Sequence, residues 1–492
     1  MKKRTKIIAT LGPASTSTSK IERMLHAGAD VFRINLSHAS IDDAKDIISL
    51  VRSQEKRIGR PVAIMLDLQG QKVRIKSFGK KPHVILKSGD KYVLDPSLND
   101  NGNQRAVGVT FKDLYKNVQP GDELLLSDAL IKLKVEQIKS KKIHTTVQRG
   151  GKLKPYQGVN KKGGGLSLSG ITQKDKSDLK KSLSLEYDYV AVSFVKSEKD
   201  INDIRKIVQH KDIKIIAKIE RNEAIKNIDK ITKAADGLLV ARGDVGVEIG
   251  IEQLPATQKF LIRKAISFDK IVIVATQMME SMIGNRVPTR AEVFDVANAV
   301  TSGVDAIMFS AETAIGKYPS DVISEASRIC IESEGAYIRP LSVDRVVPKT
   351  LPVDQVIALS AVYSAKLTKV VAIAALTETG STALWMSRVQ SNIPIYAMTQ
   401  NNKTSRRICL YKGVQSIKLD KLEENHAQAN MQVISLMRKI GTVKKGDLVI
   451  ITKGDLLGTS GGTNAMKVVE VGNMIEVNEY TYYQPIFLAR KF

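Results

Sequence analysis

Cysteine, histidine and long apolar runs are scarce in this sequence of 492 residues. The two cysteines, Cys330 and Cys409, lie far apart without a paired spacing, which excludes a disulfide framework or a cysteine-based metal site and is typical of a reducing cytosol. The six histidines form no His-Glu-x-x-His pattern, so nothing indicates zinc. No apolar run approaches the ~18 residues of a membrane span, and the apolar stretch after the basic N-terminus is too short for a secretory signal. We therefore expect a cytoplasmic protein with no membrane partner.

Acidic residues are also few relative to basic ones. The sequence has 51 aspartates and glutamates against 76 lysines and arginines, which gives a formal net charge of +25. This charge is compatible with nucleic-acid binding, with attraction of anionic substrates, or with lysines that are merely solvated. Residues 71–165 alone carry 20 basic and 8 acidic side chains, but few aromatic residues on which bases could stack. Nucleic acid is therefore not expected as the main partner.

Eight short apolar segments, each followed by a helical pattern, indicate eight β/α units and a parallel sheet. Once an interruption after the third unit is removed, about 240 residues remain, which is the size of a (β/α)8 TIM barrel. The predicted barrel strands are residues 7–10, 31–37, 62–68, 189–195, 213–219, 238–242, 271–276 and 306–310.

The interruption has an all-β pattern, which we interpret as a small β-barrel lid with Gly163–Gly165 as its exit hinge. Its predicted strands are residues 83–86, 91–94, 123–126, 131–135 and 142–147. Strands at 370–376, 395–398, 414–419 and 448–452 alternate with helices and predict a C-terminal doubly wound α/β domain. The predicted division is a catalytic barrel (1–70 and 166–345), a lid (71–165), a linker (346–351), a regulatory domain (352–475) and a C-terminal extension (476–492).

Polar residues gather at the predicted carboxyl ends of the barrel strands, where TIM barrels carry their active sites. Charged groups in buried strands are costly unless they are paired or functional, so a shared rim of them indicates a site for an anion and a metal. The rim residues are Arg33, Asn35, Ser37, Asp67, Lys218, Glu220, Arg242, Gly243, Asp244, Thr276, Gln277, Ser310 and Glu312.

These rim residues also have structural interpretations. Lys218 and Glu220 lie two residues apart on one face of a strand and can form an ion pair. Glu220 and Asp244 can be salt-bridge partners of Arg33 or Arg242, or can together hold Mg²⁺, which prefers one or two carboxylates plus substrate oxygens. The sequence contains neither a Walker-A phosphate loop nor the His-Arg-Asp loop of protein kinases.

A loop rich in hydroxyl side chains follows the first strand of the C-terminal domain and begins a helix. Hydroxyls and backbone N–H groups at a helix start favour phosphate binding, although a capped helix without a ligand has the same pattern. The candidate contacts are Thr377, Thr379, Ser381 and Thr382, and the Gly/Ser/Thr-rich segment Gly458–Asn464 is placed to complete such a pocket.

The rim residues lie in segments that resemble pyruvate kinases over nearly the whole chain. The most specific segments are Lys6–Ala14 (KIIATLGPA), Arg33–His38 (RINLSH), Ile215–Glu220 (IIAKIE), Leu239–Ile249 (LVARGDVGVEI), Ala275–Met282 (ATQMMESM), Pro288–Val300 (PTRAEVFDVANAV) and Ser310–Ala314 (SAETA). That family has the architecture predicted above. The resemblance therefore implies transfer of the phosphoryl group of phosphoenolpyruvate to ADP, giving pyruvate and ATP in glycolysis.

The resemblance also implies a role for individual residues. Arg33 holds the substrate phosphate, Lys218 neutralises the transferring phosphoryl group and the forming enolate, and Thr276 lies near the proton delivered to that enolate. Glu220 and Asp244 bind the divalent metal, which is Mg²⁺ with Mn²⁺ as the other candidate. The remaining implied contacts are Gly243, Asp244 and Thr276 with the substrate, and Arg74, Asn35 and His38 with the nucleotide. A homotetramer and a phosphorylated allosteric effector are implied as well.

The third strand departs from the pattern of many pyruvate kinases. Where those enzymes have Asp-Thr-Lys-Gly-Pro-Glu and need K⁺, this chain has Asp67-Leu68-Gln69-Gly70-Gln71-Lys72 and resembles the bacterial, K⁺-independent subgroup. The monovalent-cation region is then Asn35, Ser37, Asp67 and Lys72, with the Lys72 ammonium as the substitute for K⁺. We predict activity without K⁺, unless Lys72 is merely a solvated residue at the lid hinge.

Two further departures leave alternatives open. Gln71 replaces a proline of the hinge, and Gln157 replaces a lysine thought to contact nucleotide phosphate. A catalytically weakened paralogue that mainly senses metabolites is one alternative. A Mg²⁺-dependent lyase acting on a pyruvate enolate is another, and a requirement for ADP distinguishes it from the kinase.

Overall fold

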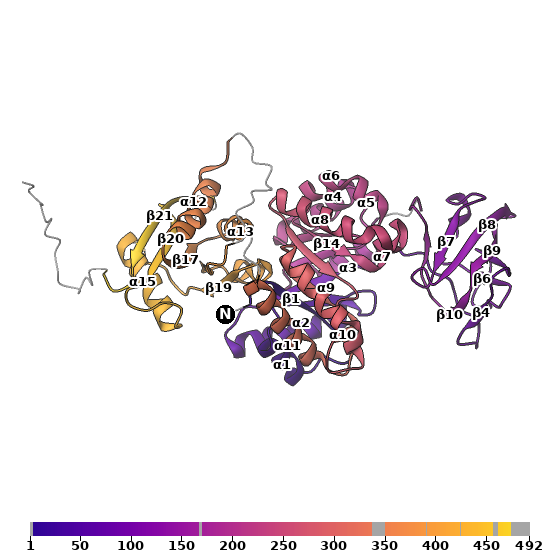
Figure 1. The fold of residues 1–492 in the computed structure, drawn as a ribbon, viewed down its shortest axis with the longest axis horizontal. Coiled ribbons are helices and arrows are strands. Elements are labelled where there is room, and N and C mark those ends of the chain that lie inside the picture. The colour runs from indigo at the N-terminus through magenta and orange to yellow at the C-terminus, as the bar shows by residue number, and fades with distance from the viewer. Residues whose placement is uncertain are drawn as a thin grey trace, which may run out of the picture.

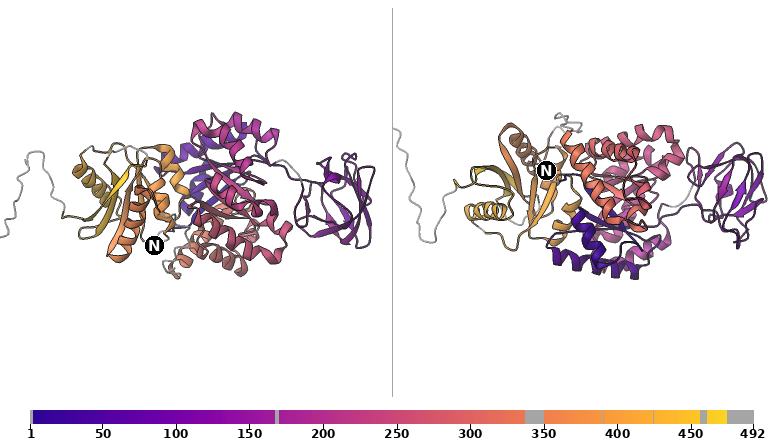
Figure 2. Two further views of the ribbon diagram at one scale, coloured as in Figure 1. Left: turned by 90° about the horizontal axis from the view of Figure 1, so that it is seen from above. Right: turned by 60° about the horizontal axis from the view of Figure 1, so that its bottom comes forward.

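The computed structural model describes residues 3–166, 170–336, 350–389, 391–423, 425–455 and 461–473. Three units lie along its long axis (Figure 1), with a barrel in the middle, an all-β unit at one end and an α/β domain at the other. The two further views in Figure 2 keep the same order. The predicted segment 476–492 and most of the predicted linker 346–351 fall outside the described residues. Among the helices that are described, none is long and apolar enough to cross a membrane.

Eight parallel strands close into the central barrel, as predicted. They are β1 (Lys6–Leu11), β2 (Val31–Asn35), β3 (Ala63–Asp67), β12 (Tyr189–Val192), β13 (Lys214–Ile219), β14 (Gly237–Ala241), β15 (Ile271–Ala275) and β16 (Ala306–Phe309). Each strand pairs with the next one along the chain, β3 pairs with β12 across the insertion, and β16 closes the barrel against β1. The helices of the barrel are α1 (Thr18–Ala27), α2 (Ile41–Ile58), α3 (Gln173–Ser182), α4 (Glu198–Val208), α5 (Asn222–Lys226), α6 (Ile228–Ala234), α7 (Arg242–Ile249), α8 (Leu254–Ser267), α9 (Arg290–Thr301), α10 (Ala311–Ala314) and α11 (Pro319–Ala336).

The barrel strands are apolar along their length because both of their faces are covered. In β1, Ile7 and Ala9 pack outward against the helices, whereas Ile8 packs into the barrel interior. Successive side chains of a strand point to opposite faces, so an uninterrupted apolar run fits a strand buried on both sides. Polar residues are then tolerated only where the strand ends, which is where the candidate site lies.

The inserted unit is all-β, as predicted, and the small barrel expected from the sequence takes the form of a curled, open half-barrel. Six strands pair in the order β11-β7-β8-β9-β5-β6, and β10 with β4 forms a separate ribbon. Their bounds are β4 (Val84–Leu86), β5 (Lys91–Asp95), β6 (Ala106–Gly108), β7 (Glu123–Leu126), β8 (Ile131–Lys139), β9 (Lys142–Arg149), β10 (Gly151–Leu153) and β11 (Val159–Lys161). Strands β6, β10 and β11 were not predicted, because each has three residues that include glycine or polar side chains, whereas the equally short β4 is apolar throughout.

The C-terminal domain is a five-stranded sheet in the order β19-β18-β17-β20-β21. Its strands are β17 (Val370–Leu376), β18 (Ile395–Thr399), β19 (Val414–Lys418), β20 (Leu448–Gly454) and β21 (Thr463–Glu470), and its helices α12 (Val353–Leu367), α13 (Ser381–Arg388), α14 (Asn402–Arg407) and α15 (His426–Lys439). Four strands are parallel, as predicted. The fifth, β21, pairs antiparallel with β20 at the edge of the sheet and was not predicted, because its polar and apolar residues are mixed and most of them are exposed.

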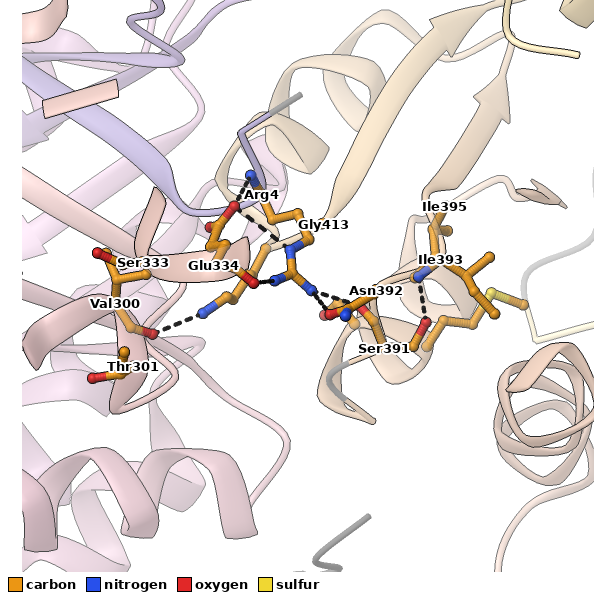
Figure 3. Close-up of a pocket in the computed structure, with 13 residues that line it drawn as sticks. Arg4, Val300, Thr301, Ser333, Glu334, Ser391, Asn392, Ile393, Ile395 and Gly413 are labelled. Atoms are coloured by element: carbon orange, nitrogen blue, oxygen red, sulfur yellow. Dashed lines mark hydrogen bonds and ion pairs between the residues drawn. The ribbon is translucent and has the colours of Figure 1, made fainter. Parts of the chain in front are cut away.

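The C-terminal domain packs against the starts of the barrel strands, at the end opposite the candidate site. Lys6 at the start of β1 donates to the carbonyl of Val414, and the Tyr189 hydroxyl at the start of β12 donates to the carbonyl of Arg407. Figure 3 shows part of this junction, where the Arg4 guanidinium reaches the Glu334 carbonyl at 2.9 Å and the Ser391 carbonyl at 3.2 Å. The polar groups of this pocket pair with each other across the domain boundary, which makes it a structural junction.

Candidate active site

A buried cluster of charges lies at the carboxyl ends of β2, β3 and β13. Arg33 of β2 donates from Nε to Oδ2 of Asp67 at 2.7 Å, and Asp67 ends β3. The other Asp67 oxygen lies 3.2 Å from the ammonium of Lys218, which also lies 3.1 Å from Oε1 of Glu220. Lys218 and Glu220 therefore do form the ion pair that the sequence allowed, within a network that also includes Arg33 and Asp67.

Within this cluster, the attraction between opposite charges outweighs the effect of burial and keeps Lys218 and Asp67 ionised. Burial by itself lowers the pKa of Lys218, but the carboxylates of Asp67 and Glu220 outweigh it and raise that pKa above its ordinary value. Burial would raise the pKa of Asp67, yet Lys218 and Arg33 hold it below its ordinary value. The ammonium and the carboxylate thus stay charged at neutral pH, so Lys218 is a fixed positive charge rather than a proton acceptor.

Glu220 and Asp244 form a second pair of carboxylates beside this cluster. Burial raises the pKa of Glu220, Lys218 opposes that shift, and the nearby negative charge of Asp244 adds to it. Oε2 of Glu220 accepts the Phe194 N–H at 2.7 Å, which leaves its lone pairs partly free. In the part of the chain that the structure describes, no cluster of three or more His, Cys, Asp or Glu residues could hold a metal. Two carboxylates are a donor set that fits Mg²⁺ or Mn²⁺, because these ions are typically held by one or two protein carboxylates together with substrate oxygens.

Asp244 forms an ion pair with Lys72, a contact that was not predicted from the sequence. The Lys72 ammonium, from the segment that leads into the lid, lies 2.5 Å from Oδ1 of Asp244. Both side chains are about one fifth exposed, at 21%. The resemblance places Lys72 in a monovalent-cation region with Asn35, Ser37 and Asp67. In the structure, Lys72 forms an ion pair with Asp244. That grouping stays a prediction for the occupied site.

Thr276 is held in a strained turn directly after β15. Its φ is +70° and that of Gln277 is +53°, although non-glycine residues, and β-branched ones above all, rarely adopt this left-handed region. The Arg242 guanidinium donates to the Thr276 carbonyl at 2.6 Å and to Oδ1 of Asp295 at 2.6 Å, so it holds the turn in place. As a result, Oγ1 of Thr276 accepts the Gly243 N–H at 2.9 Å. Strain of this kind is characteristic of functional sites.

A cleft of about 830 Å³ lies beside the charged cluster. Its lining includes Arg33, Asn35 and His38, which all come from the segment Arg33–His38, and Ser310, which follows β16. Three of the residues predicted for phosphate and nucleotide contacts thus share one cavity. Glu312 lies next to it and accepts the Ser310 N–H at 2.7 Å, which is a structural role.

Hydrogen bonds connect both ends of the lid to barrel residues that lie near Glu220 and Asp244 in the sequence. On the exit side, the Gly165 N–H donates to Glu223 at 2.6 Å, and the Gly163 N–H donates to the carbonyl of Glu248 at 2.8 Å. On the entry side, Arg221 donates to the Gln71 carbonyl at 3.0 Å. Gly163, Gly164 and Gly165 all have φ near +80 to +90°, a run that only glycine adopts without strain and that fits the predicted hinge.

Arg74 lies within the lid, away from the charged cluster. Its guanidinium donates to the Tyr156 carbonyl at 2.9 Å, and its side chain is exposed. The predicted nucleotide contact of Arg74 therefore stays a prediction that depends on the lid moving toward the barrel.

The hydroxyl loop of the C-terminal domain begins α13, as predicted. Oγ1 of Thr377 accepts the Gly380 N–H at 2.9 Å, and the hydroxyls of Thr379 and Ser381 lie 2.8 Å apart. Thr382 is buried and lies 2.9 Å from the hydroxyl of Thr463, in the described part of the predicted Gly458–Asn464 segment. The two segments thus meet, while residues 458–460 fall outside the described residues.

Three polar residues of the site, Thr10, Ser193 and Asp295, were not predicted from the sequence. Ser193 follows β12 and accepts from Lys218 at 2.7 Å, and Thr10 in β1 accepts from Arg33 at 3.0 Å. A polar residue at the end of an apolar strand was the available signal for both. Arg242 was considered as a partner of Glu220 or Asp244, but it pairs instead with Asp295, because α9 brings that carboxylate to the turn. No pattern in the sequence indicated this contact.

Comparisons with known proteins agree with this geometry. The family model described as pyruvate kinase, barrel domain, matches residues 2–323, and the pyruvate kinase alpha/beta domain model matches residues 355–469. The chain is 44% identical over 476 residues to pyruvate kinase II of Salmonella typhimurium, covering 95% of this chain and 99% of that protein. It is 39% identical to a pyruvate kinase of Geobacillus stearothermophilus, covering 96% of this chain and 81% of that one. A crystal structure of a pyruvate kinase from Cryptosporidium parvum superposes with a TM-score of 0.89 at 31% identity, covering 95% and 96% of the two chains.

Proposed function

The chain belongs to the pyruvate kinase family and is a phosphotransferase, so we propose that it transfers the phosphoryl group of phosphoenolpyruvate to ADP. We propose further that this reaction does not need K⁺ and that a phosphorylated effector controls it. The observation that carries the site assignment is the Lys218 ammonium fixed between Asp67, Glu220 and Ser193 at the barrel rim. Phosphoryl transfer needs positioning and neutralisation of charge rather than a covalent partner, and this cluster supplies both.

In this mechanism the cations act on successive negative charges of the substrate. Arg33 is oriented by Asp67 and Thr10, so its outer N–H groups face the cleft and bind the substrate phosphate. Lys218 neutralises the phosphoryl oxygens during transfer and then the enolate oxygen that remains. The Gly243 N–H and the Thr276 hydroxyl, which are bonded to each other at 2.9 Å in the structure, exchange that bond for the substrate carboxylate. Thr276 lies near the carbon that is protonated as the enolate becomes pyruvate.

Glu220 and Asp244 are the residues that would hold the divalent metal. When bound, Mg²⁺ or Mn²⁺ supplies positive charge that is shared between the protein carboxylates and substrate oxygens. The three cations Arg33, Lys72 and Lys218 balance the three carboxylates Asp67, Glu220 and Asp244 in the protein alone. An additional divalent charge therefore makes the site attractive to an anionic substrate.

The primary experiment measures pyruvate formed from phosphoenolpyruvate, ADP and Mg²⁺ in buffer free of Na⁺ and K⁺, and then with K⁺ added. We expect high activity that K⁺ barely changes. Pyruvate formed without ADP would indicate the lyase instead. No activity under either condition, even with sugar phosphates or AMP present, would favour the weakened paralogue, and Gln157→Lys would then be the variant to assay.

We propose that the Lys72 ammonium supplies the positive charge that K⁺ supplies in other members of the family. Lys72→Glu restores the acidic residue of the K⁺-dependent pattern, so its activity should rise at least about tenfold when K⁺ is added, against less than twofold for the unmodified enzyme. Lys76→Glu changes the charge of the same lid segment equally and should leave the K⁺ response unchanged. A Lys72→Glu enzyme that is equally active without K⁺ would remove Lys72 from this role.

The effector site is assigned to Thr377, Thr379, Ser381 and Thr382. In support, this loop begins α13, where backbone N–H groups favour an anion. Ser381→Glu places a negative charge at this position and should abolish activation by a phosphorylated effector, identified by screening sugar phosphates and AMP, while basal turnover changes less than about twofold. Ser381→Ala is the control and should weaken activation only partly. Unchanged activation of Ser381→Glu would contradict the assignment. The homotetramer and the cytoplasmic location stay predictions.

A further inference from the structure

Lys72 connects the lid to a residue assigned to the metal. It belongs to the segment between β3 and the first lid strand, while Asp244 lies in the first turn of α7 on the barrel. The 2.5 Å ion pair therefore crosses from one unit of the protein to the other. An ammonium 2.5 Å from Oδ1 of Asp244 competes for this carboxylate with any second cation that approaches it, so the pair bears directly on how the metal is loaded.

The returning segment of the lid is shaped around the same lysine. A Cβ placed on Gly158 would lie 2.7 Å from Cε of Lys72, closer than side chains tolerate. Cε is near the far end of the flexible Lys72 side chain, so a larger residue at position 158 would push the ammonium aside. Arg74 and Gly158 also pair as an isolated β-bridge, which joins the entering and returning segments. The position of the Lys72 ammonium thus depends on both connections of the lid.

Without a metal, the negative charge of Asp244 has to be compensated by a cation of the protein. The Lys218 ammonium lies 3.1 Å from Glu220 and 3.2 Å from Asp67, so its charge is already shared between those two carboxylates. Of the cations whose ion pairs are described, Lys72 is the one that contacts Asp244. Without it, the second carboxylate would lack compensation.

We propose that Lys72 is the counter-ion of Asp244 in the metal-free protein and that a divalent cation has to displace it, which couples metal loading to release of the lid. The inference rests on the proposed role of Glu220 and Asp244 as metal ligands. Metal and ammonium compete for the same carboxylate, so each weakens the binding of the other by the same factor. The displaced ammonium remains on the lid, which then loses its ion pair with α7 on the entry side and keeps the backbone contact of Gly163 with Glu248 on the hinge side.

The test measures Mn²⁺ binding to the full-length protein without substrates, by the electron paramagnetic resonance signal of free Mn²⁺. Lys72→Met should bind Mn²⁺ about tenfold more tightly than the unmodified protein, a typical size for coupling between competing ligands. Lys76→Met removes the same charge from the same segment, where Lys76 contacts Asn99 rather than a carboxylate, and should bind as the unmodified protein does. Thermal unfolding of each variant confirms that it is folded.

Hydrogen exchange of residues 70–76 and 156–162 gives a second readout. Mn²⁺ should accelerate exchange there in the unmodified protein, whereas Lys72→Met should exchange rapidly with or without Mn²⁺. Loss of Mn²⁺ binding in Asp244→Asn, together with equal affinities of Lys72→Met and Lys76→Met, would overturn this proposal and leave the metal site intact. Equal binding by Asp244→Asn and the unmodified protein would overturn the metal site itself.

Discussion

Replacing Lys218 with methionine should lower kcat on the order of a thousandfold, because the cluster then lacks the charge that faces the transferring phosphoryl group and the enolate. Lys218 is 8% exposed and is held by three oxygens, from Ser193, Asp67 and Glu220. Methionine keeps an unbranched side chain that is one atom shorter, and it removes the charge together with the N–H donors. Initial rates at saturating ADP and Mg²⁺, with phosphoenolpyruvate varied, measure kcat and KM separately.

Lys218→Arg is the matched control for this prediction. It keeps the positive charge, but the planar guanidinium does not fit three oxygens arranged around one ammonium, so we expect only partial activity above that of Lys218→Met. The unfolding midpoint of both variants shows whether the buried carboxylates still allow folding. A Lys218→Met enzyme with more than about a tenth of the original kcat would contradict the assigned role.

Arg388→Met should lower the free energy of unfolding by about 3–5 kcal/mol, since breaking a buried ion pair from one side leaves an uncompensated charge. Arg388 ends α13 and contacts both oxygens of Asp305, which directly precedes β16, and the two side chains are 3% and 1% exposed. Asp305 also accepts the Val272 N–H at 2.9 Å, at the start of β15. Urea-induced unfolding followed by circular dichroism measures the effect.

An exposed pair provides the comparison for Arg388. Lys206 and Asp203 lie 3.9 Å apart on α4 with side chains 77% and 35% exposed, so Lys206→Met should change stability by less than about 1 kcal/mol. Adding Asp305→Asn to Arg388→Met should recover part of the loss, because it removes the orphaned charge. Equal stabilities of Arg388→Met and Lys206→Met would show that the domain junction does not depend on this pair.

The barrel was predictable because its strands repeat one simple pattern eight times. Apolar segments such as Ile271–Ala275 are buried on both faces and end where polar residues begin, so the order of residues along the chain already marks the rim of the site. The open form of the lid was not predictable, because closure depends on whether the two outer strands β6 and β11 pair, and no local pattern reports a contact between segments so far apart in the sequence.

By itself, the sequence determined the α/β architecture, the rim and the types of charge that the rim carries. Those properties follow from hydrophobic patterning and from the high cost of burying charge within a strand, which are local constraints. Only the tertiary structure decided which charge pairs with which: Arg33 with Asp67, Arg242 with Asp295, and Lys72 with Asp244. Each of these pairs joins residues from different elements, and a Coulomb interaction depends on the distance in space that the fold sets rather than on separation along the chain.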